Sequence, residues 1–444
     1  MVAVKRRTVL EPNYNRGDVE ALSQHYNEPQ WLRDLRLQSW EVYASLPMPH
    51  MEEEWRRTDY RTIRWEEAAR SVVPNGVVVD MVPRKTLEPL IGERQGGLMV
   101  FVDGKLVYRE LADELGATGV IFTDLHTAVR EHSDLVQASL MTKAVKPTDG
   151  KFAALHGALW TYGAFVHVPR NVAAGLPMHI VVYNTQPGAN LGHTLVVVEE
   201  NAQATVQVDY ASAKGEAQSA FIGATELIVG DAANLQYVSL QEWNRQTYEF
   251  SHQRALVGRD AQLDWVLGTM GSRLTKAFIE ADIIGKGGSA RVSGFFFADK
   301  GQFFDLDTQQ NHNAPLSVSD LLFKGAAKDN ARTLWQGMIK SLPKMQKIDG
   351  YQACRNLVLS EEARMDSIPG LEIEADDVKC SHAATFGTLE EQLIFYLMSR
   401  GIERPMAQLM VIDGFFDELL QRIPFERVRE RLQEAIEAKI LGEG

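Results

Sequence analysis

The segment Val229-Gly230-Asp231-Ala232-Ala233-Asn234-Leu235-Gln236-Tyr237-Val238 decides the fold, because the chain repeats it. Residues 257–266, VGRDAQLDWV, match it without a gap, and residues 284–292, IGKGGSARV, form a third copy. In each copy a β-branched residue precedes glycine, small or polar turn residues follow, and a polar residue then stands between apolar or small ones. Such a short period indicates structural units that stack on one another.

Similar small-residue turns recur along the chain and set the length of the unit. Aligning them on one small or apolar residue per turn gives steps of 31, 28, 27, 41 and 32 residues between Ala204, Leu235, Leu263, Ala290, Ala331 and Ala363. About 30 residues suit a coil of two or three short strands, whereas a propeller blade needs about 40–45. The repeat therefore favours a parallel β-helix over a sandwich, the alternative being chance similarity among glycine-rich turns.

The regions before and after the repeats differ from them in their sequence pattern. Residues 1–154 are expected to form a mostly helical domain with strands such as 76–79 and 98–102, residues 155–387 the β-helix, and residues 388–444 a helical domain. A capping box at 388–391, a helix stop at Gly401 and a helix start at Pro405 support the last of these.

One apolar stripe runs through the final helical segment. It comprises Phe425, Val428, Leu432, Ile436 and Ile440 at helical spacing. Packing within the chain and docking of a partner both explain such a stripe.

Composition excludes several classes of protein. The chain has 444 residues, of which 45% are hydrophobic, and a net charge of −13, which argues against nucleic acid as the main partner. No window approaches the length of a membrane span, and the N-terminus lacks the apolar stretch of a secretory signal. We therefore expect a cytoplasmic protein with no membrane partner. In that setting Cys354 is expected to be a buried packing residue.

No established catalytic motif is present, and we predict no catalytic residue. The sequence lacks a phosphate-binding loop, a GxSxG elbow and an HExxH helix. One local pair does suggest chemistry: Cys380 and His382, in Lys379-Cys380-Ser381-His382. On a strand their side chains share a face about 6–7 Å apart, and both suit zinc, copper or iron–sulfur centres. A closed site needs further ligands, and simple packing of the two residues is the alternative.

A series of short segments follows in a fixed order through the C-terminal third. They are Gln310-Asn311-His312, residues 319–325, 337–339, Gln352, residues 355–357, 359–360, 369–373 and 376–382, Phe395-Tyr396-Leu397 and residues 399–402. With these segments the chain resembles the SufB/SufD family of iron–sulfur cluster assembly proteins. The Lys-Cys-Ser-His string and the N-terminal segments 29–32 and 54–59 are similar to the SufD branch of that family.

The resemblance implies a right-handed parallel β-helix flanked by helical domains, and a complex with a SufB-like subunit and a SufC-like ATPase. It implies that the end strands of the β-helix pair with the SufB-like chain. His382, with Cys380 beside it, would be a ligand of a nascent iron–sulfur cluster shared with that chain. The C-terminal helical region would dock the ATPase, with Phe395, Tyr396, Arg400 and Gly401 as partner-binding candidates.

Two other functions stay open at this point. The first is a structural homodimer with no metal role, which is also a form the isolated chain could take. The second is a carbohydrate-active β-helix enzyme such as a polysaccharide lyase, which would need carboxylates or calcium with Arg or Lys on its outer face.

Overall fold

The computed structural model of the protein describes residues 11–70, 76–88, 94–423 and 425–442. Two ten-stranded sheets dominate it. In spatial order, the first sheet comprises β2 (Lys105–Leu111), β1 (Gly97–Val102), β5 (Met178–Asn184), β8 (Gln203–Ser212), β10 (Asn234–Glu242), β12 (Gln262–Thr269), β14 (Ser289–Ala298), β16 (Val318–Ala327), β18 (Ile348–Val358) and β20 (Val378–Thr388). The second comprises β19 (Arg364–Ile373), β17 (Arg332–Ser341), β15 (Phe303–His312), β13 (Leu274–Ile283), β11 (Thr247–Val257), β9 (Ser219–Val229), β7 (Gly192–Val198), β4 (Tyr162–Val168) and β3 (Ile121–Asp124), with β6 (Ala189–Asn190) against β9.

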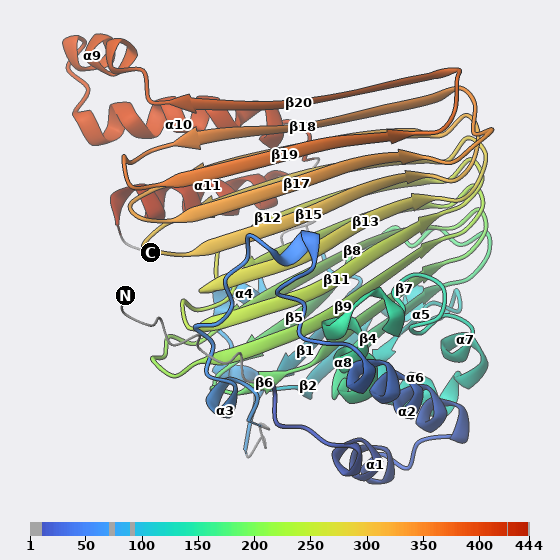
Figure 1. The fold of residues 1–444 in the computed structure, drawn as a ribbon. Coiled ribbons are helices and arrows are strands. Elements are labelled where there is room, and N and C mark those ends of the chain that lie inside the picture. The colour runs from blue at the N-terminus through green and yellow to red at the C-terminus, as the bar shows by residue number, and fades with distance from the viewer. Residues whose placement is uncertain (1–10, 71–75, 89–93, 424, 443–444) are drawn as a thin grey trace, which may run out of the picture.

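The chain alternates between the two sheets from β8 onward, so each pair of strands makes one coil. Every strand pair is parallel except β1–β2 and β3–β4. This is the parallel β-helix that the repeat predicted, with the coils stacked from β1 at one end to β20 at the other (Figure 1). β1 and β3 precede residue 155 and extend the two sheets, and the domain bounds stay a prediction.

The repeat is the register of the first sheet. Leu235 pairs with Leu263, and Leu263 pairs with Ala290, so the aligned sequence positions are neighbours in space. The last two anchors were assigned wrongly. The neighbour of Ala290 is Ser319, whereas Ala331 directly precedes β17 in the second sheet. The step of 41 residues therefore joined different sheets, because both turns of a coil use small residues.

One corner of the coil holds a column of residues in the left-handed conformation. Each donates its backbone N–H to a carbonyl of the next coil. The column comprises Asn171, Asn201, Ala232, Asp260, Gly287, Leu316 and Lys347. The repeated glycine lies beside it where coils approach most closely: a Cβ on Gly285 would collide with the backbone nitrogen of Arg259. These contacts explain why the turns repeat.

Helices flank the coil at both ends of the chain (Figure 1). Among the described residues they are α1 (Arg16–His25), α2 (Gln30–Ser45), η1 (Glu53–Trp55), α3 (Trp65–Ala68), η2 (Val79–Met81), α4 (Arg84–Leu87), α5 (Asp113–Gly116), α6 (Leu125–Glu131), α7 (Ser133–Gln137), η3 (Pro147–Asp149), α8 (Lys151–Leu159), α9 (Glu391–Ser399), α10 (Arg404–Leu420) and α11 (Glu426–Leu441).

Two local predictions are wrong. The apolar run 76–79 is not a strand, because Val77 packs in a cluster with Val100 and Val102 on the face of β1, and the chain then turns into η2. The expected capping box at 388–391 fails because Thr388 ends β20, and Glu390 precedes α9 without a side-chain cap. The predicted helix stop and helix start are confirmed. Gly401, with a φ of 87°, follows the end of α9, and Pro405 lies in the first turn of α10.

The apolar stripe of α11 packs against the outer face of the first sheet. Val428, Leu432 and Ile436 are fully buried in a cluster with Val238 and Leu240 of β10. Packing within the chain is therefore the correct explanation of this stripe.

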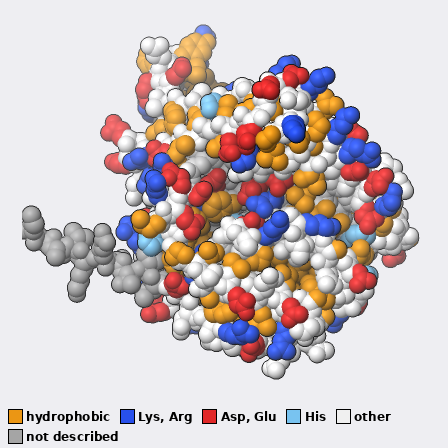
Figure 2. Space-filling view, turned by 45° about the vertical axis from the view of Figure 1, so that its right-hand side comes forward, with side chains coloured by type: hydrophobic (Ala, Val, Ile, Leu, Met, Phe, Trp, Pro, Cys, Tyr) orange, Lys and Arg blue, Asp and Glu red, His pale blue; other side chains and the backbone are white. Residues whose placement is uncertain are grey.

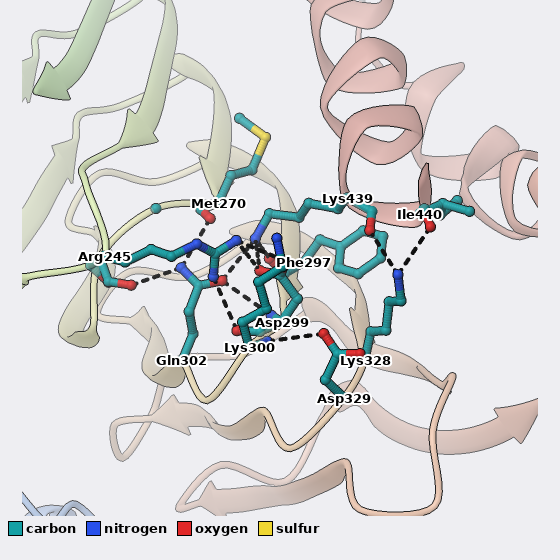
Figure 3. A network of polar contacts seen from close by, with 12 residues as sticks. Arg245, Met270, Phe297, Asp299, Lys300, Gln302, Lys328, Asp329, Lys439 and Ile440 are labelled. Atoms are coloured by element: carbon teal, nitrogen blue, oxygen red, sulfur yellow. Dashed lines mark hydrogen bonds and ion pairs between the residues drawn. The ribbon is translucent and has the colours of Figure 1, made fainter. Parts of the chain in front are cut away.

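A polar network fixes the C-terminal end of α11 (Figure 3). The Lys439 side chain is almost fully buried, and its Nζ donates hydrogen bonds to the Phe297 carbonyl at 2.6 Å, Asp299 Oδ1 at 2.9 Å and Gln302 Oε1 at 2.8 Å. Burial lowers the pKa of Lys439 to about 8, with Asp299 opposing that shift. A buried lysine needs this full set of acceptors, so the helix has one favoured position.

A second buried group joins the N-terminal region to the coil. Glu226 of β9 accepts hydrogen bonds from the backbone N–H groups of Met141 and Val145, and its Oε1 lies 3.1 Å from Nε2 of His193. Burial raises the pKa of the Glu226 carboxyl to about 8 and lowers the pKa of His193 to about 3. Both groups are therefore neutral at pH 7.

Glu226→Gln is expected to remove part of the pH dependence of stability. The folded-state pKa lies above the ordinary 4.5. The folded state thus binds this proton more tightly, and the resulting stability is lost as pH rises toward 8. Between about pH 5 and 8.5, the free energy of unfolding of the wild type should fall by about 2–4 kcal/mol more than that of the variant.

Urea denaturation across that pH range measures this difference. Glu200→Gln is the matched control, because Glu200 is exposed on a neighbouring coil and should leave the slope unchanged. Equal slopes for the wild type and Glu226→Gln would show that Glu226 is already ionised in the folded protein.

Candidate functional site

The coil ends on two strands that each have one unpaired edge. In the part of the chain that the structure describes, β20 and β19 are the last strands of the first and second sheets, and each has a neighbouring strand on one side only. Their side chains are far more exposed than those of the strands below, and they include Ile368, Leu371 and Phe386 at 38%, 39% and 52% exposure. This open end, at the top of Figure 1, therefore presents free backbone groups together with apolar side chains.

Cys380 and His382 both lie on β20, where the strand pattern placed them on one face. Cys380 pairs with Gly350 of β18, and His382 pairs with Gln352. The Gln352 side chain is fully buried and bonds to the carbonyls of Gly337 and Gly370 across the coil. Since paired residues in a parallel sheet share a face, Cys380 and His382 lie over the interior of the coil at its open end.

The two candidate ligands differ in exposure. His382 is exposed, whereas Cys380 is partly buried with its sulfur beside Gly350. Burial raises the pKa of the Cys380 thiol, and Asp349 adds to this, while a hydrogen bond from the backbone of Gly350 opposes it. Cys380 is therefore mainly a thiol at neutral pH, and a metal would have to displace its proton.

The second cysteine behaves as the sequence suggested. Cys354 is fully buried in the core inside the coil, and burial raises its pKa to about 12. It is inert packing rather than a ligand. Within the described ranges, no group of three or more His, Cys, Asp or Glu side chains is arranged to hold a metal ion. Cys380 and His382 are thus two donors without a closed cage.

The partner-binding candidates lie on a different feature, the helix that follows β20. Phe395 and Tyr396 of α9 are 72% and 52% exposed, and the Arg400 guanidinium lies over the Tyr396 ring, 5.2 Å from its centre. Gly401 makes the left-handed turn into α10. In Figure 2 hydrophobic side chains are visible on the part of the molecule that projects at the top, where α9 extends beyond the strands in Figure 1.

Sequence reasoning missed part of this surface. Four more apolar side chains of α9 and α10 are exposed: Leu393, Met398, Met406 and Met410. In α9 only Ile394 is buried, so the helix has one inward residue and an apolar outer face. The composition of α9 could have predicted this surface from the sequence, because a helix that is apolar on all sides needs contacts on all sides, from the rest of the chain or from a partner.

Comparison with known proteins places this geometry in a family. The model of the SufBD core domain, described as SUF system FeS cluster assembly, matches residues 181–415, and the SufBD N-terminal region matches residues 18–180. The chain belongs to the SufBD family. The core match covers every predicted site residue: Cys380 and His382 on β20, Phe395 and Tyr396 on α9, and Arg400 and Gly401 between α9 and α10.

Several relatives of the SufBD family are similar over nearly their whole length. The iron–sulfur cluster assembly protein SufD of Bacillus subtilis is 32% identical, over 95% of this chain and 97% of that protein. SufBD family proteins of Staphylococcus epidermidis and Staphylococcus aureus are 28% identical over 92% of this chain and 89% of theirs. No helix in the described part of the chain is long and apolar enough to cross a membrane.

Proposed function

We propose that this protein is a non-catalytic scaffold subunit of a cytoplasmic iron–sulfur cluster assembly complex. A SufB-like chain pairs with its open end, and a nascent cluster is built between the two chains. The observation that carries this proposal is the position of Cys380 and His382 on β20, a terminal strand with an unpaired edge. The cluster is the cargo of the complex rather than a resident cofactor.

The open end favours strand pairing with another chain. Unpaired backbone N–H and C=O groups of β19 and β20 are a template for further strands, and most edge strands are protected against this. Here the edge carries exposed apolar residues such as Phe386 and Leu371. A partner that continues both sheets would cover them and would bring its own ligands to Cys380 and His382.

An incomplete ligand pair suits a cluster that must be passed on. Four cysteines from one chain would hold iron and sulfide tightly, whereas a site divided between two chains can open at their interface. The relatives named above are described as assembly proteins, which favours this function over the carbohydrate-active alternative.

The ATPase is proposed to dock on α9 and α10. Their exposed aromatic and methionine side chains form an adaptable apolar surface, and Tyr and Met are common in interface cores. α9 lies beyond the ends of the strands (Figure 1), and α10 packs against the face of the first sheet, so this surface is separate from the edges of β19 and β20.

Affinity purification of the tagged chain from its native cell tests the proposal. Recovery of a SufB-like chain and an ATPase, with iron and sulfide in the complex, is the expected result. A metal-free homodimer would overturn it in favour of the structural alternative, because the same edge strands would then pair with a second copy.

The double variant Phe395→Ala, Tyr396→Ala is expected to weaken binding of the ATPase about tenfold or more, because buried aromatic anchors dominate interfaces. The strength of binding can be measured by isothermal titration calorimetry with the purified ATPase. Tyr108→Ala is a matched control, since Tyr108 is also partly exposed but lies on β2 at the opposite end of the coil. Unchanged affinity in the double variant would remove α9 from the docking surface.

A further inference from the structure

A hollow of about 470 Å³ lies beside the edge of β19, at the open end of the coil. Three arginines from distant parts of the chain line it. Arg57 belongs to the segment after η1, Arg332 begins β17 and Arg364 begins β19. The remaining lining includes one acidic residue, Asp366, and the apolar side chains of Ile368 and Phe386.

The positive charge of this hollow is only partly compensated. Arg332 and Arg364 are register partners on neighbouring strands, an arrangement in which like charges repel. They share one carboxylate: Asp366 lies 3.0 Å from Arg364 Nε and 3.5 Å from an Arg332 terminal nitrogen. Three guanidinium groups thus face a single acid within the lining.

The third arginine shares its acid with a neighbour. Among the described residues Arg57 forms one ion pair, with Glu53 at 3.7 Å, and Glu53 is also bound at 2.7 Å by Arg56. A basic hollow of this kind stands out in a chain whose net charge is −13.

The Arg332 guanidinium is held in place by an aromatic ring. Its central carbon lies over the ring of Phe303, 5.2 Å from the ring centre. Its Nε is buried without a hydrogen-bond partner in the part of the chain that the structure describes, so the terminal nitrogens are left to make its polar contacts.

We propose that this hollow binds an oxyanion, supplied as a carboxylate side chain by the chain that covers the open end. Guanidinium groups bind carboxylates through paired hydrogen bonds, and three of them converge here. Phe386 and Ile368, exposed at 52% and 38%, favour a protein segment over a free ion, since the segment would bury them at the same time. The inference rests on the proposed pairing of β19 and β20 with a second chain.

The first experiment measures association of this chain with its SufB-like partner by calorimetry at several salt concentrations. Arg57→Gln and Arg364→Gln should each weaken binding about tenfold and flatten its salt dependence. Asp366→Asn should strengthen binding, because it removes the competing acid. Arg170→Gln, an exposed arginine paired with Glu200 on an early coil, is the control and should change nothing. The Arg57 and Arg364 side chains are 40% and 66% exposed, so both variants should fold.

The second experiment titrates the isolated chain with inorganic pyrophosphate. Binding that Arg364→Gln abolishes, together with weakened association, is the expected pair of results. Pyrophosphate binding without any effect of the variants on association would keep the oxyanion site but overturn a partner carboxylate as its source. If the variants change neither association nor pyrophosphate binding, the inference is wrong. If the wild-type chain associates with no partner, the proposed function is wrong, and the pyrophosphate titration then tests only whether the hollow binds an oxyanion.

Discussion

His382→Ala is expected to leave the chain folded and associated while iron bound by the assembled complex falls tenfold or more. Substitutions of groups that only support metal ligands already cost about 10–100-fold in affinity or activity, and loss of a ligand should cost at least as much. Folding should be unaffected because His382 is exposed on the last strand and its removal creates no internal cavity. Iron and sulfide analysis of the purified complex, with its visible absorption spectrum, measures the effect.

Two further variants define this result. Cys380→Ala should lower iron loading in the same direction, and the double variant should be no worse than additive if both residues bind one cluster. His25→Ala is the control, since His25 is an exposed histidine in α1, far from the open end. Normal loading of the His382→Ala complex would show that His382 only packs at the interface and is not a ligand of the cluster.

Lys439→Met is expected to lower the free energy of unfolding by about 3 kcal/mol, the usual cost of breaking a buried ion pair. The substitution removes the cation from a buried site and leaves the acceptors Asp299, Gln302 and the Phe297 carbonyl without it (Figure 3). Arg245 still binds both oxygens of Asp299, at 2.7 and 2.8 Å, so the loss is partial. Urea denaturation gives the energy.

Hydrogen exchange would locate the damage. Lys328 Nζ bonds the Lys439 and Ile440 carbonyls at the end of α11, so amides of that helix should lose protection before those of the coil. Lys340→Met is the matched control, because Lys340 is a partly exposed lysine paired with Glu372. A loss below about 1 kcal/mol, the usual range of a surface pair, would mean that the apolar stripe alone holds α11 in place.

Much of the fold could be predicted from the sequence because the coil is periodic. The aligned positions Leu235, Leu263 and Ala290 are paired on adjacent strands, so residues that repeat in the sequence are stacked on one another in the first sheet. The same principle placed Cys380 and His382 on one face of a strand, since side chains alternate along any extended segment. The resemblance of the C-terminal third of the chain to a known family also predicted the correct architecture.

Local similarity failed where two different sites use the same residue types. Ala331 resembled the earlier anchors because both turns of a coil need small residues, yet it precedes a strand of the other sheet. Thr388 resembled a helix cap because threonine is common at caps, but backbone pairing with Val358 keeps it in β20. In both cases strand pairing across the coil overrode a local signal.

The sequence by itself determined that the chain coils with a period near 30 residues, that glycine recurs in its turns, and that Cys380 and His382 share a face of a strand. These properties depend on near neighbours and on regular alternation. Only the tertiary structure decided that β20 is the terminal strand, that Lys439 lies buried against Asp299, and that Arg57 meets Arg332 and Arg364. Such contacts join residues far apart along the chain, and no local pattern encodes which distant segment will fill a given neighbouring position.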